Sequence, residues 1–189
     1  MADQTMDRAS PFAEPIADAA RHGVTLTAVP RGSLWQIAAW PDSFGEIETA
    51  LAKTCGCAAP APGRAVKTED DRLLIRVEPL KWWVVGPDGA ECPLSPDPEQ
   101  GAWLDMSHDQ AGIAVEGKGA DELLKRFVSI DLRERAFPDL SFATTQAHHM
   151  ITRVLRRDLA GTPRYEVLVM RSYGDNLHEI LAHHLHRLA

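Results

Sequence analysis

The residue types best suited to chemistry stand close together between Trp103 and His108, in the run Trp-Leu-Asp-Met-Ser-His. This run offers a carboxylate, a hydroxyl and an imidazole within four positions, after a long proline-containing loop and before a predicted strand. In one interpretation, Asp105 or His108 acts as an acid or base. In the other, Asp105 and Ser107 satisfy backbone groups of a turn that His108 anchors. The second is favoured, because the sequence identifies no partner residue for a reaction.

A second concentration of charge is a set of arginines around one predicted hairpin. Guanidinium groups match carboxylates, so the set could bind an anion or a partner protein. It could equally protect the solvated end of a hairpin, where charged side chains discourage edge pairing. The sequence leaves both interpretations open for Arg153, Arg156, Arg157 and Arg164.

Two adjacent tryptophans, Trp82 and Trp83, lie on one predicted strand, so their rings face opposite sides of the sheet. One ring should enter the core. The other must cover a second layer of the fold, a ligand or a partner, and large aromatic residues are enriched at the centres of interfaces. Both tryptophans are therefore candidate interface residues.

The groups that could bind metal do not form a complete ligand set. His183 and His186 have the i, i+3 spacing of a helical ligand pair, but histidines also suit the C-terminal end of a helix. The motif Cys55-Gly56-Cys57 lacks the second pair of a zinc site. We therefore expect neither a metal site nor catalytic residues in this chain, and a histidine metal-binding module is kept as an alternative.

Composition excludes several classes of protein. The 189 residues carry a net charge of −7, whereas nucleic acids and anionic membranes are bound by basic surfaces. No apolar run approaches the roughly 20 residues of a membrane span, and the N-terminus lacks the features of a secretory signal. The three cysteines form no disulfide framework. These features predict a cytoplasmic protein without nucleic-acid or membrane partners.

The elements that position these residues follow from apolar periodicity and turn residues. The first half predicts, in order, a helix from Pro15 to Gly23, a hairpin of strands 24–28 and 34–40, a helix capped by Ser43 and Glu46 that ends near Gly56, and strands 73–78 and 81–85. The second half predicts a strand over 113–117, a helix with the apolar face Ala120, Leu123, Leu124 and Phe127, strands 148–157 and 164–170, and a helix beginning at Asp175 or Asn176. The order of the second half resembles a split βαβ unit. The sequence therefore predicts an α+β fold.

Several of these residues together resemble a known family. The run Asp105-x-Ser107-His108, followed by a strand, Gly117, a helix through Leu124 and the turn at Asp131, is similar to the folate-binding aminomethyltransferase superfamily. More closely, residues 10–189 resemble the gamma subunit of heterotetrameric sarcosine oxidase. The supporting features are Ser10-Pro11, Ala59-Pro60, Glu78-Pro79, the stretch from Trp82 to Asp88, Phe137-Pro138 and Arg171-Ser172-Tyr173.

The resemblance implies one folate-binding aminomethyltransferase-like domain over residues 10–189, with antiparallel or mixed sheets and packed helices, after a disordered segment of residues 1–9. It implies a non-catalytic gamma subunit that packs on the alpha subunit and helps the heterotetramer assemble. In that family the complex demethylates sarcosine to glycine and passes the methyl carbon to tetrahydrofolate. FAD, FMN, NAD and zinc belong to the alpha, beta and delta subunits, and none is expected in this chain.

The alternative hypothesis is a stand-alone folate-binding or one-carbon (aminomethyl) transfer protein. Two departures weigh against it, because the chain is too short for the C-terminal barrel of a complete aminomethyltransferase and lacks that enzyme's opening motif. A pteridine site needs a carboxylate for the ring N–H groups and an arginine for the glutamate tail. The candidate ligand residues are Asp105, His108 and Arg171. The candidate partner surface comprises the loop 87–103, Trp82, Trp83, Arg153, Arg156 and Arg157.

Overall fold

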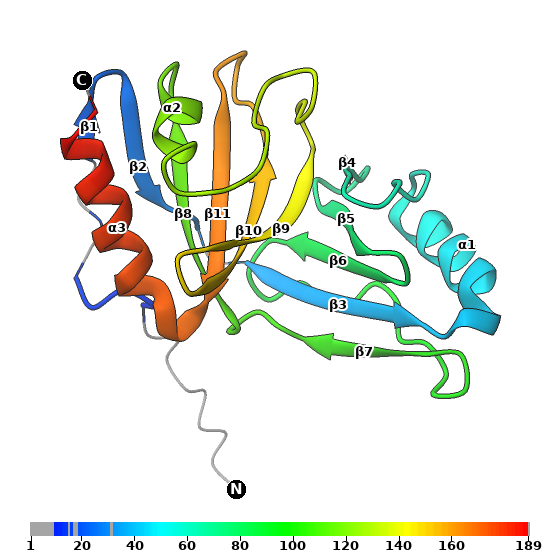
Figure 1. The fold of residues 1–189 in the computed structure, drawn as a ribbon. Coiled ribbons are helices and arrows are strands. Elements are labelled where there is room, and N and C mark those ends of the chain that lie inside the picture. The colour runs from blue at the N-terminus through cyan, green and yellow to red at the C-terminus, as the bar shows by residue number, and fades with distance from the viewer. Residues whose placement is uncertain (1–9, 15, 17–18, 31, 189) are drawn as a thin grey trace, which may run out of the picture.

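A computed structural model describes residues 10–14, 16, 19–30 and 32–188 of the chain. The segment expected to be disordered, residues 1–9, lies outside this range. The described chain forms two sheets with helices packed on them (Figure 1), which is the α+β class that the sequence predicts. Every strand pairing in both sheets is antiparallel.

The strands divide unequally between the sheets. The larger sheet has the order β1 (Ala19–Arg21), β2 (Val24–Ala28), β8 (Gln110–Glu116), β11 (Arg164–Met170), β10 (Met150–Arg156) and β9 (Phe142–Ala147). The smaller sheet has the order β4 (Ala65–Lys67), β5 (Leu73–Glu78), β6 (Lys81–Gly86), β3 (Ser33–Ala39) and β7 (Gly101–Asp105). The helices are α1 (Phe44–Cys55), α2 (Ala120–Leu124) and α3 (Gly174–His186), with 3-10 turns η1 (Pro41–Ser43) and η2 (Arg171–Tyr173).

Three apolar cores hold the layers together. The largest lies between the six-stranded sheet and helices α2 and α3, and a second lies between the five-stranded sheet and α1. The third lies between the sheets, where Leu34, Ile75 and Trp83 of one sheet meet Phe142 and Leu155 of the other. Both faces of the five-stranded sheet are therefore used for packing, although only one of them carries a helix.

The amphipathic helices form where the sequence predicts them. Leu177, Leu181 and Leu185 recur every four residues along α3 and are buried against the six-stranded sheet. The apolar face predicted from Ala120 to Phe127 is also buried, although α2 itself ends at Leu124. Helix α1 ends at Cys55 and is capped by Gly56, whose φ of 63° is the left-handed conformation that glycine adopts readily.

The predicted capping box at the start of α1 is wrong. Ser43 makes no capping hydrogen bond to the helix, and its hydroxyl instead donates to the carbonyl groups of Trp40 and Gln100. The hydroxyl thus ties the start of α1 to the residue before β7. Glu46, the other half of the predicted box, accepts a hydrogen bond from the Gln100 side chain at 2.7 Å.

The predictions of an N-terminal helix and of a hairpin between residues 24–28 and 34–40 are also wrong. The part of the predicted helix at residues 19–21 is strand β1, whereas Pro15 lies outside the described residues. His22 and Gly23 both have positive φ, at 53° and 73°, which is the geometry of a two-residue hairpin turn and not of a helix end. Strand β2 therefore pairs with β1 and β8, while β3 belongs to the other sheet.

The second half of the chain contains the predicted split βαβ arrangement. The predicted strands 113–117 and 148–157 correspond to β8 and β10, and β11 lies between them in the sheet, antiparallel to both. Strands β8 and β10 therefore run parallel to each other, and the connection between them contains α2 and the further strand β9. Strand β9 was missing from the predicted elements, as were β4 and β7.

Candidate functional site

The candidate ligand residues lie near a cavity between the two sheets. The cavity has a volume of about 110 Å³ and is walled by apolar side chains from both sheets. The principal ones are Leu34, Leu73, Ile75, Trp83, Met106, Leu155 and Leu168. Polar groups enter from β8, β11 and the turn that follows β7.

Asp105 and Ser107 form the turn that the structural interpretation predicts. The Ser107 backbone N–H donates to the Asp105 carboxylate at 2.8 Å, and the Ser107 hydroxyl donates to the same carboxylate oxygen. The hydroxyl also accepts the backbone N–H of Leu34 at 3.0 Å. These bonds attach the end of β7 to the start of β3. Asp105 is not among the residues that line the cavity.

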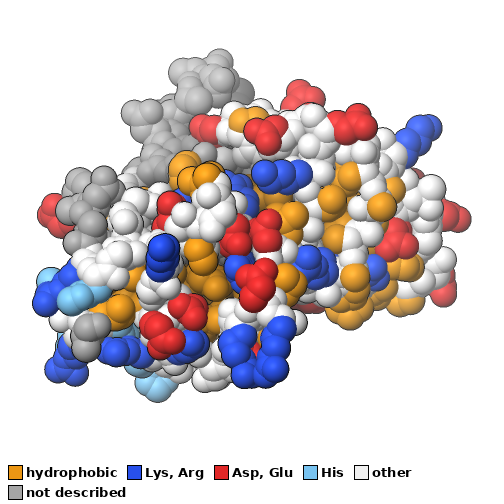
Figure 2. Space-filling model, turned by 90° about the horizontal axis from the view of Figure 1, so that it is seen from above, with side chains coloured by type: hydrophobic (Ala, Val, Ile, Leu, Met, Phe, Trp, Pro, Cys, Tyr) orange, Lys and Arg blue, Asp and Glu red, His pale blue; other side chains and the backbone are white. Residues whose placement is uncertain are grey.

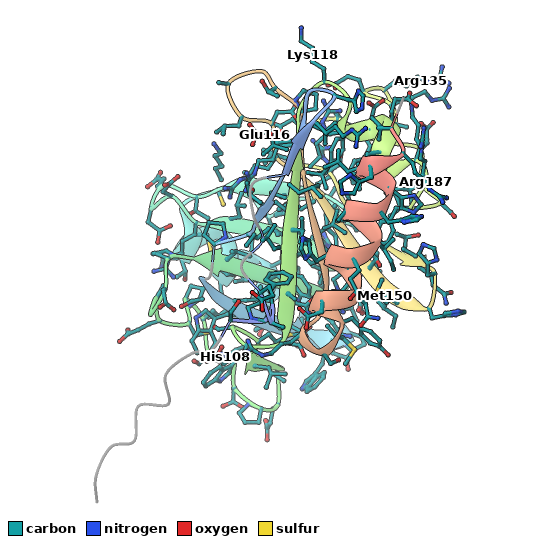
Figure 3. The ribbon with its side chains drawn as sticks, turned by 90° about the vertical axis from the view of Figure 1, so that its left-hand side faces the viewer. His108, Glu116, Lys118, Arg135, Met150 and Arg187 are labelled. Carbon is teal, nitrogen blue, oxygen red and sulfur yellow. The ribbon has the colours of Figure 1, made fainter. Side chains whose placement is uncertain are left out.

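His108 and Arg171, in contrast, come together at the mouth of the cavity. Both line the inner cavity and also an outer hollow of about 560 Å³, and Pro11 is shared in the same way. The backbone explains the pairing, because the Arg171 N–H donates to the Asp109 carbonyl at 2.7 Å. Figure 3 shows His108 below the start of β8, at the opposite end of that strand from Glu116.

The acidic group of the cavity is Glu166, which the sequence analysis missed. Its side chain on β11 lines the cavity and is buried, and its carboxylate lies 3.3 Å from Arg164 and 3.6 Å from Arg157. Two arginines therefore balance a charge that would be costly to bury alone. The signal available in the sequence was an acidic residue within the apolar strand pattern Tyr-Glu-Val-Leu-Val, with arginines on either side.

The arginines of the predicted hairpin serve different purposes. Arg156 is buried, donates to the Asp158 carboxylate and the Phe137 carbonyl, and forms an ion pair with Glu134. Hydrogen bonding to Asp158 raises the pKa of its guanidinium further above the usual value. The residue therefore fastens the segment after α2 to strand β10, which leaves little of it for a partner protein.

Arg153 and Arg157 complete the hairpin set. The guanidinium of Arg153 lies 5.0 Å from the ring centre of Trp83 and donates to Gln110, and burial lowers its pKa. Arg157 is more exposed and pairs with Glu166. Figure 2 looks down on this end of the molecule and shows Lys and Arg side chains interspersed with Asp and Glu, rather than one continuous basic surface.

Trp82 and Trp83 face opposite sides of the sheet as predicted, and both rings are buried within this chain. Trp82 stacks on Phe44 of α1, with ring centres 5.5 Å apart. Trp83 packs against Phe142 of the other sheet, so it covers a second layer of the fold. The exposed tryptophans of the described chain are Trp103 on β7 and Trp40, which directly follows β3. Trp103 lies at the end of the loop 87–103, which with the partly exposed Arg157 forms the accessible part of the candidate partner surface among the described residues.

No three His, Cys, Asp or Glu side chains of the described residues are placed to hold a metal ion. Burial raises the pKa of Cys55 to about 11, which keeps the thiol protonated near neutral pH and disfavours it as a metal ligand. His183 instead contacts His184, whose ring lies 6.3 Å from that of His148. No helix in the described part of the chain is long and apolar enough to cross a membrane.

Comparisons with known proteins bear on the fold. No protein-family model matches the sequence, and no curated protein matches it significantly. Among solved structures, the chain is similar to a chain of the heterotetrameric sarcosine oxidase from Corynebacterium sp. U-96, solved in complex with pyrrole 2-carboxylate. The TM-score is 0.75 at 21% sequence identity, and the match covers 89% of this chain and 87% of that chain. This chain therefore has the fold of a chain of heterotetrameric sarcosine oxidase over almost its whole length, as the resemblance implies.

Proposed function

We propose that this chain is the gamma subunit of a heterotetrameric sarcosine oxidase, in which it packs on the alpha subunit and supports assembly, not catalysis. Such a complex would demethylate sarcosine to glycine in the cytoplasm and pass the methyl carbon to tetrahydrofolate. FAD, FMN, NAD and zinc would be held by the alpha, beta and delta subunits.

The observation that carries this proposal is a likeness between whole chains. Because the match covers similar shares of both chains, the two have nearly equal length. The likeness therefore concerns a complete chain of this size in the neighbouring structure, and not one domain of a longer chain.

The cavity supports a role that needs no ligand in this chain. Its volume of about 110 Å³ is below the roughly 300–1,000 Å³ of typical small-molecule pockets. The polar residues near the cavity also have structural roles, because Asp105 stabilises a turn and Glu166 pairs with two arginines.

Native purification of the tagged, full-length chain from its own host tests this proposal. We expect it to elute with three other chains, identified by mass spectrometry, in a yellow complex that consumes oxygen when sarcosine is added. Deleting the chain should reduce the amount of assembled complex. A colourless species of 20.8 kDa, or a complex that assembles and oxidises sarcosine fully without this chain, would contradict the proposal.

A second candidate function is the binding of a reduced folate, with one-carbon transfer as the activity. The observation that favours it is the buried Glu166 carboxylate in the cavity wall, with Arg171 and His108 at the mouth. A carboxylate inside suits the N–H groups of a pteridine ring, and an arginine outside suits the glutamate tail.

Calorimetric titration of the isolated full-length chain with tetrahydrofolate tests this candidate. Binding should be lost in Glu166→Gln and kept in Glu116→Gln, because both carboxylates pair with Arg164 but only Glu166 lines the cavity. Absence of binding heat with the native chain would rule the candidate out.

A further inference from the structure

The two sheets together end in four strands, and β7 differs from the other three. Strands β1 and β4 have three residues each and end in Arg21 and Lys67, and β9 exposes the polar residues Thr144 and Gln146. Short length and polar or basic side chains are common ways in which an edge avoids pairing with another chain. Strand β7 has neither protection between Ala102 and Leu104.

The exposed side chains of this edge are large and apolar. Trp103 is 45% exposed and Leu104 is 56% exposed, and Trp40 beside the start of β7 is 43% exposed. Both tryptophans are held in position. The Trp40 indole N–H donates to the Pro98 carbonyl at 2.9 Å, and the Trp103 ring lies 5.4 Å from that of Trp35. A side chain that is already ordered loses little entropy when a partner binds it.

The backbone N–H and C=O groups of β7 that do not bond to β3 point to the outer side of the strand, where another strand could pair with them. The Trp40 N–H donates to the Gln100 carbonyl and the Met106 N–H donates to the Leu34 carbonyl, so the even-numbered residues direct their backbone groups toward β3. Backbone groups alternate sides in an antiparallel ladder. Those of Trp103 therefore point away from β3, toward the outer side of the sheet.

The segment of the chain that contains this edge carries charge of one sign. From Trp82 to Gly117 the chain has seven Asp and Glu residues and no Lys or Arg. Asp97 and Glu99 are exposed just before β7, and Asp105 is exposed at its end. An apolar strand with acidic residues at both ends is complementary to an apolar strand with basic residues at both ends.

We propose that β7 is the docking edge for one extended strand of a partner subunit, apolar in the middle and carrying Lys or Arg toward both ends. This inference rests on the proposed function, and it identifies the surface through which the subunit would bind its partner. Addition of a strand to an exposed sheet edge is a recurring mode of recognition, with backbone bonds for affinity and side chains for specificity. A second copy of this chain is disfavoured, because antiparallel pairing of two β7 strands would place Asp105 near Asp97 and Glu99 of the other copy.

Two variants matched in exposure test this inference in the purified complex. Leu104→Lys places a positive charge on the docking edge, whereas Ile151→Lys places one on β10, which has a neighbouring strand on each side. Both native side chains are 56% exposed, so both variants should fold, as circular dichroism would verify. We expect Leu104→Lys to reduce the recovery of assembled complex at least about tenfold, a loss typical of a central interface residue, and Ile151→Lys to leave it unchanged.

Amide hydrogen exchange adds a readout that depends on the backbone. The Trp103 amide should exchange more slowly in the complex than in the isolated chain, while the amides of Ala102 and Leu104, which face β3, should change less. Higher salt should weaken the complex, because the attraction is partly ionic.

The outcomes separate the two proposals. Equal recovery of the two lysine variants, or an unchanged Trp103 amide in an intact complex, overturns the docking edge and leaves the subunit assignment standing. Failure of the native chain to enter any complex overturns both. A dimer of this chain that Leu104→Lys dissociates would also overturn the inference, because the occupant would be a second copy.

Discussion

The two sheets are built from similar strands but end differently. The six-stranded sheet is covered by α2 and α3 and ends in β1 and β9, which are short or polar (Figure 1). The five-stranded sheet packs on both faces and still leaves an apolar edge at β7. Trp82 and Trp103 of this one sheet are respectively fully buried and nearly half exposed. The six-stranded half therefore ends in short or polar edges, and its exposed Ile151 lies on an inner strand, whereas the five-stranded half leaves Trp103 and Leu104 at an open edge.

Ionic groups follow the same division. In the six-stranded half, the buried Arg156 forms ion pairs with Asp158 and Glu134 and a hydrogen bond to the Phe137 carbonyl, all within the chain. In the five-stranded half the acidic residues beside β7 are exposed, and the segment 82–117 that contains them has no lysine or arginine. One set of charges fixes the fold, and the other sets the charge that a partner must carry.

The largest effect is expected at the buried tryptophan. Trp82→Ala should lower the free energy of unfolding by about 3–5 kcal/mol, because it leaves a cavity where the ring stacks on Phe44. Trp82→Phe should cost less than half as much, since it keeps a ring and removes an indole N–H that has no hydrogen-bond partner among the described residues. Urea unfolding of the isolated chain measures both. An equally large loss in Trp103→Ala would show that the two tryptophans do not differ as proposed.

A smaller loss is expected at the buried arginine of the other half. Arg156→Met should lower the free energy of unfolding by about 2–3 kcal/mol, because it leaves the Asp158 carboxylate and the Phe137 carbonyl without their donor. The value is below that for a fully buried pair, since Glu134 and Asp158 reach solvent. Arg157→Met is the matched control, and it should cost less than about 1 kcal/mol, because Arg157 is partly exposed and Arg164 still pairs with Glu166. Equal losses in urea unfolding would contradict an internal role for Arg156.

A pH-dependent effect is expected where α3 meets the turn between β9 and β10. Burial lowers the pKa of His184 below its usual 6.5, and the nearby positive charges of His183, His148, Arg126 and Arg187 lower it further. The folded chain thus binds a proton at His184 less readily than the unfolded chain does. This contribution to stability is fully present above pH 6.5 and is lost as the pH falls through the folded-state value.

Unfolding measured between neutral and mildly acidic pH checks this prediction. His184→Gln removes the titrating group and should flatten the decrease in stability on the acidic side. The control is His178→Gln, on the same helix but outside this group, which should leave the slope unchanged. A native slope that His184→Gln does not alter would place the pH dependence elsewhere. The effect should be smaller than the two above, because the side chain is partly exposed.

The elements predicted from the sequence are those with strong periodicity. The faces of α1 and α3 and the strands β5, β6, β10 and β11 have apolar patterns that local burial determines. Strands β4, β7 and β9 were missed because they lie at or near sheet edges, where one or both faces are exposed and the pattern is weak. The hairpin turn at His22 and Gly23 was mistaken for a helix end because a left-handed glycine suits both.

The candidate site was predictable in part for a similar reason. Local spacing showed that Asp105 and Ser107 could close a turn, and the hydrogen bonds have that form. His108 and Arg171 are 63 positions apart in the sequence, and the pairing of β8 with β11 brings them together. No local pattern in the sequence reveals that pairing. Glu166 is missed because its burial against the other sheet, and the pairing of β10 with β11 that brings Arg157 beside it, are known only from the fold.

The smallest effect on the isolated chain, and the most informative, is expected at Trp103. Trp103→Ala should change the free energy of unfolding by no more than about 0.5 kcal/mol, as is usual for exposed positions, because its ring has one aromatic neighbour and is nearly half exposed. If β7 receives a partner strand, the same change should lower the thermal midpoint of the purified complex, since the ring would then be buried between subunits. Trp82→Ala must lower the midpoints of chain and complex alike, because its ring is buried before any partner binds. A Trp103→Ala complex that melts like the native one would mean that the exposed edge is a tolerated irregularity of the five-stranded sheet and that the partner surface lies on another face.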